Sequence, residues 1–242
     1  MTGAGGSPRL KGRVWITRAQ PGAARTAARL VALGYDPVIA PLLEIRVLPQ
    51  PAPDLTDIAA LVFTSRNAVA AFAGLRPDMA TARECPVLTV GDATAEAARA
   101  AGFADVRSAS GDLEALVRLI VADPSPILPG GAILHPAASE PAGDLAAMLG
   151  PSVPVRTLPI YEAVETDVGA PEEFDTVLIH SPRAARALVA RLGTSREARL
   201  AVAISPAAAA PLTSAGFREI RIAATPDEDA LIAALGKPPP RV

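Results

Sequence analysis

The sequence predicts an α/β protein made of two similar domains, each with a mostly parallel sheet. Short apolar stretches of strand character alternate with stretches of helical spacing along the chain, as in parallel sheets covered by helices. A second indication is an internal repeat, because Ala101-Gly102-Phe103 and its flanks match Ala215-Gly216-Phe217 and its flanks. Two extended segments flanked by proline, 41–49 and 153–164, are typical of strands that connect two bodies.

Each element follows from its spacing and its end signals. The first helix is expected to start at Pro21 and to stop at Gly34, since proline suits a first turn and glycine suits a helix end. Asp112 precedes a helix whose apolar residues share one face. Strands are expected at 14–16, 35–40, 61–63, 86–90, 105–109, 132–135, 176–180, 200–204 and 219–223. Helices are expected at 21–33, 68–72, 95–101, 112–121, 145–149, 183–192, 207–215 and 229–235.

Composition limits the classes of function. Half of the 242 residues are hydrophobic but only 3% are aromatic, so the core is built from aliphatic side chains. The net charge of -2 argues against broad nucleic-acid binding. Lysine occurs only at Lys11 and Lys237, so the basic residues are almost all arginine. Arginine suits carboxylate or phosphate contacts, although a GC-rich genome explains the bias equally well.

Compartment and partners follow from what the sequence lacks. Cys85 is the only cysteine, which excludes an internal disulfide and a multi-cysteine metal site. No signal peptide and no apolar run of membrane-spanning length is visible, so we expect a cytoplasmic protein without a membrane partner. A monomer is the simplest oligomeric state. Residues 1–11 and 238–242 are expected to be loose tails.

Small polar turns at strand ends are the candidate ligand contacts. The stretch 61–72 runs from an apolar strand through Thr64-Ser65 directly into a helix, whose free N–H groups can hold an anion. A weaker echo follows the strand at 177–180, where Ser181 opens the next helix. Two interpretations stay open for these turns, namely helix capping and a pocket for several carboxylates or phosphates. The turns are Thr17-Arg18, Thr64-Ser65-Arg66-Asn67, Gly91-Asp92-Ala93-Thr94, Ser181-Pro182-Arg183 and Ser205-Pro206.

Other chemistry has little support in the residues. His135 and His180 are the only histidines, and each is read as a structural residue at a strand end. No metal-ligand set, Walker loop or GxGxxG motif is present, so no metal is expected, and redox chemistry and phosphoryl transfer have no visible apparatus. Tyr161 lies in the second extended segment, where its hydroxyl either donates a proton to a leaving group or simply packs the linker.

Taken in order, these stretches resemble the uroporphyrinogen-III synthase family from Val14 to about Leu235. The most specific piece is Leu61-Val62-Phe63-Thr64-Ser65-Arg66-Asn67-Ala68-Val69. The remaining pieces are Ile16-Thr17-Arg18, Leu33-Gly34-Tyr35, Pro41-Leu42-Leu43-Glu44-Ile45, Val90-Gly91-Asp92-Ala93-Thr94-Ala95, Ile160-Tyr161-Glu162 and Ala215-Gly216-Phe217.

The resemblance implies two α/β domains, of which one is discontinuous. The expected domains are 12–40 with 165–237, and an inserted domain at 50–152, joined by the connecting strands 41–49 and 153–164. It also implies a cofactor-free lyase reaction. Hydroxymethylbilane, a linear tetrapyrrole, loses its hydroxyl and closes through a spiro intermediate to uroporphyrinogen III with the last ring inverted.

Two site residues are carried over from the family by position, and the others come from the polar turns at the strand ends. Tyr161 falls on the family's tyrosine and is expected to help the hydroxyl leave, in a cleft between the domains. The substrate's eight carboxylates need many donors, and Thr94 falls on a family threonine of the same cleft. The expected substrate-binding residues are Arg18, Thr64, Ser65, Arg66, Gly91, Thr94, Ser181 and Arg183.

Two departures from the family pattern keep other functions open. Ala207 and Ala208 follow Ser205-Pro206, where members often carry a hydroxyl pair. The turn beginning at His135 replaces an arginine- and glycine-rich turn. The alternatives are a non-catalytic two-domain module that binds an anionic ligand and a regulatory synthase-like protein.

Overall fold

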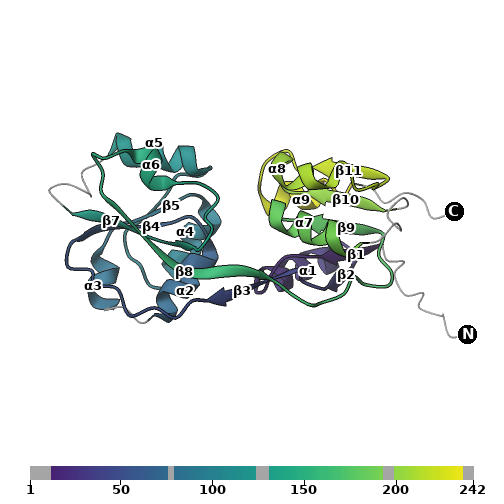
Figure 1. Cartoon of the computed structure of the whole chain (residues 1–242), viewed down its shortest axis with the longest axis horizontal. Helices are drawn as coiled ribbons and strands as arrows, with labels where there is room; N and C mark the ends of the chain where they lie inside the picture. Colours follow the sequence, from purple (N-terminus) through teal and green to yellow (C-terminus); the bar gives the residue numbers. More distant parts are fainter. Residues whose placement is uncertain (1–11, 76–78, 124–130, 193–198, 237–242) are drawn as a thin grey trace, which may run out of the picture. The chain divides into compact units, whose positions relative to one another are not determined.

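The computed structural model describes residues 12–75, 79–123, 131–192 and 199–236, with the elements labelled in Figure 1. The expected tails at 1–11 and 238–242 lie outside these residues. The chain divides into two compact units, residues 1–44 with 164–242 (unit 1) and residues 45–163 (unit 2). It crosses between them within β3 (Leu43–Val47) and within β8 (Val155–Glu165). No helix of the described residues is long and apolar enough to cross a membrane.

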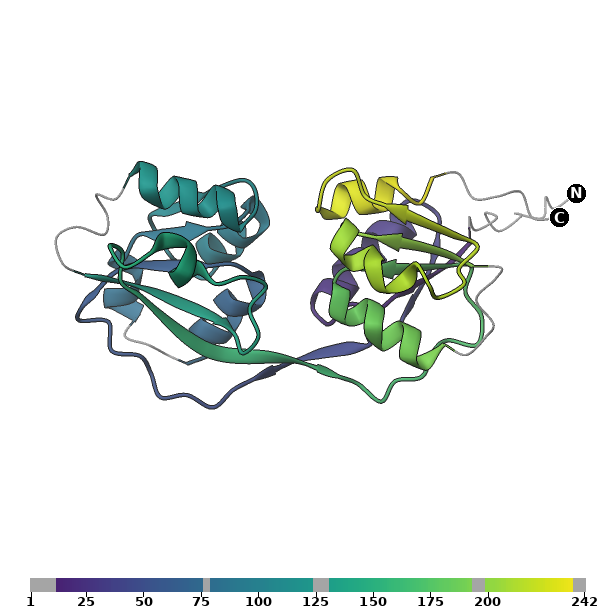
Figure 2. The same ribbon diagram turned by 45° about the horizontal axis from the view of Figure 1, so that its top comes forward.

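Unit 1 is a parallel sheet with helices on both faces (Figure 2). Its strands lie in the order β2 (Asp36–Ile39), β1 (Arg13–Ile16), β9 (Thr176–Ile179), β10 (Leu200–Ala203) and β11 (Glu219–Ile222). Trp15 packs on one face with residues of α7 (Pro182–Arg191) and α8 (Pro206–Ala209). Val14 and Ile16 pack on the other with α1 (Gly22–Ala32) and α9 (Glu228–Ala233), as the alternation of strand side chains requires.

Unit 2 has the same construction. Its parallel strands lie in the order β8, β7 (Ala132–Ala138), β4 (Ile58–Phe63), β5 (Val87–Thr89) and β6 (Val106–Ser108). One face packs on α2 (Arg66–Gly74), α3 (Met79–Glu84) and α4 (Asp92–Ala100). The other packs on α5 (Leu113–Ala122) and α6 (Leu145–Leu149). At the edge, β3 runs antiparallel to β8, because Leu48 donates its N–H to Ile160 while Thr166 donates to Leu42.

The two sheets correspond strand for strand once the internal repeat is applied. Strands β4, β5 and β6 take the places of β9, β10 and β11, while β7 and β8 take those of β1 and β2. The repeat glycines play one role in both copies, since Gly102 and Gly216 have φ of +94° and +76° and end a helical turn before an edge strand. The α/β fold class with two similar parallel-sheet units is confirmed.

Three details of the elements differ from the sequence-based expectation. The turn expected to begin at His135 lies inside β7, which continues to Ala138. The helix expected at 207–215 is α8, only four residues long, followed by a 3₁₀ turn at Ala210–Leu212. Pro211 lies in this turn and lacks the N–H that a continuing α-helix needs. The short helix α3 has no counterpart among the expected elements, because its six residues carry no helical period long enough to recognise.

Candidate functional site

Each sheet has one point where the strand order reverses, and in sheets of this kind ligands bind at the carboxyl ends of the strands beside that point. In unit 2 the reversal lies between β4 and β7, because the chain proceeds from β4 to β5 on one side and from β7 to β8 on the other. In unit 1 it lies between β9 and β1. The residues that follow β4, β9 and β1 are Thr64-Ser65, His180-Ser181 and Thr17-Arg18, all of which lie in expected ligand turns or, for His180, next to one.

Two uncharged hydrogen-bonded pairs occupy the unit 2 position. Thr64 Oγ1 lies 3.3 Å from His135 Nε2, on the neighbouring strand β7. His135 is only 2% exposed, and this burial lowers the pKa of its imidazole, so the ring is neutral at pH 7. A neutral imidazole keeps one nitrogen as an acceptor, which allows the Thr64 hydroxyl to be held in a fixed direction.

The second pair joins Ser65 to Tyr161. Ser65 Oγ lies 2.8 Å from the Tyr161 hydroxyl and also accepts the N–H of Ala68 at 3.0 Å, as the N-cap of α2. Tyr161 is 8% exposed. Burial raises the pKa of its phenol, and the Ser65 hydrogen bond opposes that rise without cancelling it. Tyr161 is therefore a protonated donor at neutral pH, placed by β8 beside the start of a helix.

The remaining unit 2 candidates surround two helix starts. Arg66 is the first residue of α2 and is partly buried. Gly91 is the N-cap of α4, and Thr94 lies on the buried side of that helix, 6% exposed. Asp92 lies in the same first turn, and hydrogen bonds from Ser108 and Ser110 hold the pKa of its carboxyl below the usual range. Asp92 thus places a negative charge at a turn that was expected to bind carboxylates.

An ionised network occupies the unit 1 position. Arg18 Nη1 lies 2.6 Å from Glu228 Oε2, and His180 Nε2 lies 3.2 Å from the same oxygen. Thr26, on α1, donates its hydroxyl to Glu228 Oε1. Burial disfavours the Glu228 carboxylate, but His180, Thr26 and Arg18 together outweigh burial and lower its pKa to about 2. Gly22 lets Arg18 lie against α1, because a Cβ there would come within 2.5 Å of Arg18 Nε.

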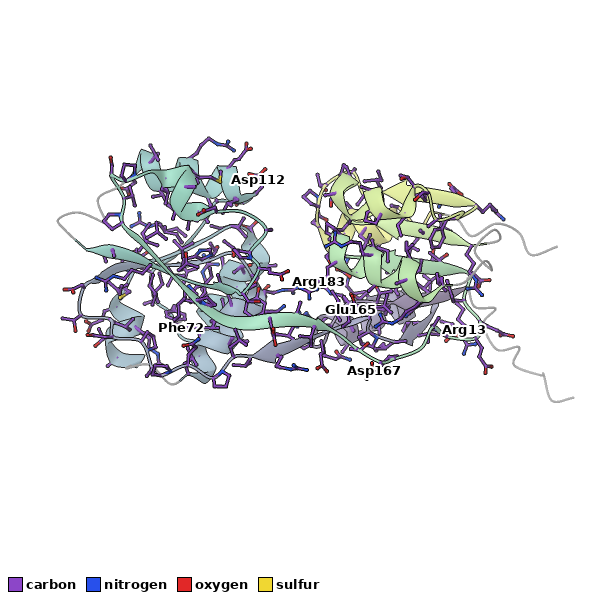
Figure 3. All side chains as sticks on the ribbon, in the orientation of Figure 1. Arg13, Phe72, Asp112, Glu165, Asp167 and Arg183 are labelled. Carbon is purple, nitrogen blue, oxygen red and sulfur yellow. The ribbon has the colours of Figure 1, made fainter. Side chains whose placement is uncertain are left out.

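Ser181 and Arg183 complete the unit 1 candidates. Ser181 is the N-cap of α7 and accepts the N–H of Ala184 at 3.2 Å, as Ser65 does for α2. Arg183, labelled in Figure 3, is the second residue of α7. Its side chain is partly buried. The capping interpretation of both serines is therefore confirmed, and Ser205 caps α8 in the same way at 3.3 Å. Capping uses one lone pair of each hydroxyl and leaves its proton for another partner.

Sequence reasoning missed Glu228 and Thr26. Glu228 stands in the run Asp227-Glu228-Asp229, which reads as the acidic start of a helix, and Asp227 does cap α9. Thr26 lies in the middle of α1, where a hydroxyl gives no local signal. Within the described residues, no group of three or more His, Cys, Asp or Glu side chains could hold a metal ion.

A family model described as "Uroporphyrinogen-III synthase HemD" matches residues 24–233. The chain belongs to the uroporphyrinogen-III synthase family. It is an enzyme, a lyase of heme biosynthesis that cyclises hydroxymethylbilane to uroporphyrinogen III. The two non-catalytic alternatives are therefore set aside.

Solved structures agree on the fold. Uroporphyrinogen-III synthetase from Helicobacter pylori matches with a TM-score of 0.66 and 21% identity, over 93% of this chain and 97% of that chain. A mutant uroporphyrinogen III synthase from Thermus thermophilus matches with a TM-score of 0.53 and 17% identity, over 91% and 96%. No curated protein sequence matches significantly.

Proposed function

We propose that Tyr161 is the proton donor of the synthase reaction. The hydroxyl of hydroxymethylbilane is a poor leaving group, because it would depart as hydroxide. A proton passed from the Tyr161 phenol to that oxygen lets the carbon–oxygen bond break with release of water. The electron-rich pyrrole beside the carbon supplies the electron pair that stabilises the resulting cation. The phenolate is left with a negative charge.

The observation that carries this proposal is the state of the Tyr161 hydroxyl. It is nearly buried, it is held at 2.8 Å from Ser65, and its raised pKa keeps it protonated at neutral pH. A general acid needs a retained proton and a fixed direction, and both features are present. His135 is less suited to donate, because burial keeps its imidazole neutral.

Substrate binding is assigned to polar residues near the two points where the strand order reverses. The donors proposed for carboxylates are Arg18, Thr64, Arg66, Ser181 and Arg183, with backbone N–H groups at the starts of α2 and α7. Glu228 takes one N–H of Arg18 and leaves the other guanidinium donors for a ligand. Gly91 and Thr94 are also proposed to bind substrate, but to contribute less to binding its carboxylates, because the negative charge of Asp92 disfavours an anion there. A cytoplasmic monomer and the domain limits 12–40 with 165–237 and 50–152 belong to the same proposal.

The test compares the only two tyrosines of the chain. Tyr161→Phe should lower kcat about 100-fold with freshly made hydroxymethylbilane, the lower range for loss of a general acid. Tyr35→Phe is the matched control, because Tyr35 donates to the Gly236 carbonyl at 3.0 Å in the unit 1 core. It should keep kcat. The product should be separated into the type III isomer and the spontaneous type I isomer. Turnover of Tyr161→Phe within twofold of the parent would remove Tyr161 from the mechanism.

A further inference from the structure

We propose that Ser65 is a positioning residue that donates its proton to the Tyr161 oxygen and so leaves the Tyr161 proton directed at the substrate. This inference rests on the proposed role of Tyr161. It changes the role of Ser65 from a grip on a substrate carboxylate to a partner of the proton donor.

The proton and the two lone pairs of the Ser65 hydroxyl support this assignment. The hydroxyl has one proton and two lone pairs, and the N–H of Ala68 occupies one lone pair at 3.0 Å. The contact of 2.8 Å with Tyr161 can then run in either direction. If Tyr161 donated, its proton would be held by Ser65 and a substrate oxygen could receive it only after that bond broke. If Ser65 donates, the Tyr161 proton is free for transfer.

The helix start favours the second direction. An N–H that donates to Ser65 Oγ draws electron density from the oxygen and makes the serine proton a better donor. Ala68 is the third residue of α2, a helix of nine residues, so the positive end of the helix dipole adds to the same effect. Ala68, Ser65 and Tyr161 thus form a chain of donors that points from the helix to the phenol oxygen.

The hydrogen bond from Ser65 to the Tyr161 oxygen becomes stronger as the proton leaves Tyr161. A serine hydroxyl bonded to a phenolate makes a charge-assisted hydrogen bond, which is shorter and stronger than the bond to a neutral phenol. An interaction that strengthens in the transition state raises kcat, whereas equal binding in both states changes only KM. Burial raises the pKa of Tyr161 and would otherwise make it a weak acid, and the Ser65 bond works against this rise.

Unit 1 shows that a serine at a helix N-cap does not by itself bring a tyrosine hydroxyl next to it. Ser181 caps α7 with the same extended backbone, at φ -162° against -155° for Ser65. The second tyrosine, Tyr35, donates to Gly236 instead. Among the described residues, the combination of a capping serine and a tyrosine therefore occurs only in unit 2.

The experiment measures Ser65→Ala in two backgrounds. In the parent enzyme kcat should fall about tenfold, the effect of one hydrogen bond to a developing charge, with KM changed less than about twofold. In the Tyr161→Phe background the same substitution should change kcat less than about twofold, since the group it supports is gone. Ser65→Thr keeps the hydroxyl and should restore kcat to within about twofold of the parent.

Two further variants separate positioning from folding. Ser65→Gly keeps a favourable N-cap backbone without the hydroxyl and should show the same loss of kcat as Ser65→Ala. Asp112→Ala removes the N-cap of α5 in the same unit, at the residue labelled in Figure 3. There Asp112 Oδ1 accepts the N–H of Ala115 at 2.9 Å. It should keep kcat, and thermal unfolding followed by circular dichroism checks that every variant is folded.

The outcomes distinguish the two proposals. Equal losses of kcat in both backgrounds, or a rise in KM with unchanged kcat, would show that Ser65 acts without Tyr161 and would overturn the inference. A loss of kcat in Asp112→Ala as large as in Ser65→Ala would overturn it as well. If Tyr161→Phe itself keeps full turnover, the proposed function fails first, irrespective of the Ser65 results.

Discussion

The two units have sheets of the same strand order, but they differ in the charges found where that order reverses. Both have the same strand order, and in both a serine caps the helix after the central strand. In unit 1 that point is ionised, with Glu228 between Arg18 and His180. In unit 2 it holds two uncharged pairs, Thr64 with His135 and Ser65 with Tyr161, beside Arg66 at the start of α2. The fold therefore fixes where polar side chains gather, while the residues that follow the strands decide which chemistry they serve.

This difference suits two tasks. Fixed charges attract and orient an anionic substrate, but a carboxylate with a pKa of about 2 neither gives nor takes a proton at neutral pH. Buried hydroxyls and a neutral imidazole attract anions less and can move or direct protons. Unit 2 is accordingly the unit to which the proton transfer is assigned.

Glu228→Gln should destabilise unit 1 by about 2–3 kcal/mol, because Arg18 is left partly buried without its carboxylate. Trp15 is the only tryptophan, is fully buried in unit 1 and reports that unit by fluorescence. Urea unfolding followed at Trp15 should shift to lower urea concentration. Hydrogen exchange of β4 amides should report unchanged unit 2 stability, and an equal loss there would contradict the independence of the two networks.

Acid should weaken unit 1 through the same carboxylate. The folded pKa of Glu228 is about 2 and the ordinary value is 4.5, so its contribution is complete above pH 4.5 and is lost as the pH falls toward 2. The full shift corresponds to about 3 kcal/mol, and partial solvent screening reduces this to about 1–2 kcal/mol. The Trp15 unfolding midpoint should fall over this range, whereas Glu228→Gln should remove that part of the pH dependence.

His135 should make the stability of unit 2 depend on pH, in a higher pH range than Glu228 does for unit 1. Because burial lowers the folded pKa below 6.5, the unfolded chain takes up a proton first, and unit 2 loses stability as the pH falls below 6.5. His135→Gln should abolish this dependence and cost about 1 kcal/mol at pH 7 through poorer packing against Thr64. Peptide-resolved hydrogen exchange of residues 58–63 measures it. A unit 2 response confined to pH below 4.5 would show that His135 does not titrate as described.

Ser181→Ala should cost about 1 kcal/mol of unit 1 stability, since the N–H of Ala184 loses its acceptor. Ser181→Gly should cost only about a few tenths of a kcal/mol, because glycine is tolerated at an N-cap. Trp15 fluorescence again gives the free energy of unfolding. Equal losses for alanine and glycine would mean that Ser181 stabilises α7 by contacts other than the cap.

Much of the fold can be read locally, and much of the site cannot. The capping serines Ser65 and Ser181 and the helix-ending Gly102 and Gly216 act within a few residues of themselves, so their roles are visible in the sequence. Ser65 and Tyr161 are 96 positions apart, and Arg18 and Glu228 are 210 apart. Such pairs form only when the sheet order brings distant strand ends together, and neither spacing nor composition encodes that order. The resemblance to a family pointed to Tyr161, but it gave no sign of Glu228.

The insertion of unit 2 within the sequence of unit 1 has a consequence for synthesis on the ribosome. Unit 2 is continuous in the chain and can fold once its residues have emerged. Unit 1 begins with β1, yet Arg13 must wait for Asp175, its partner 162 positions later. At roughly 5–20 residues per second, that interval is on the order of 8–30 s. During it the apolar strand Val14-Trp15-Ile16 has no neighbour on its β9 side, and we expect it to be a segment that chaperones protect.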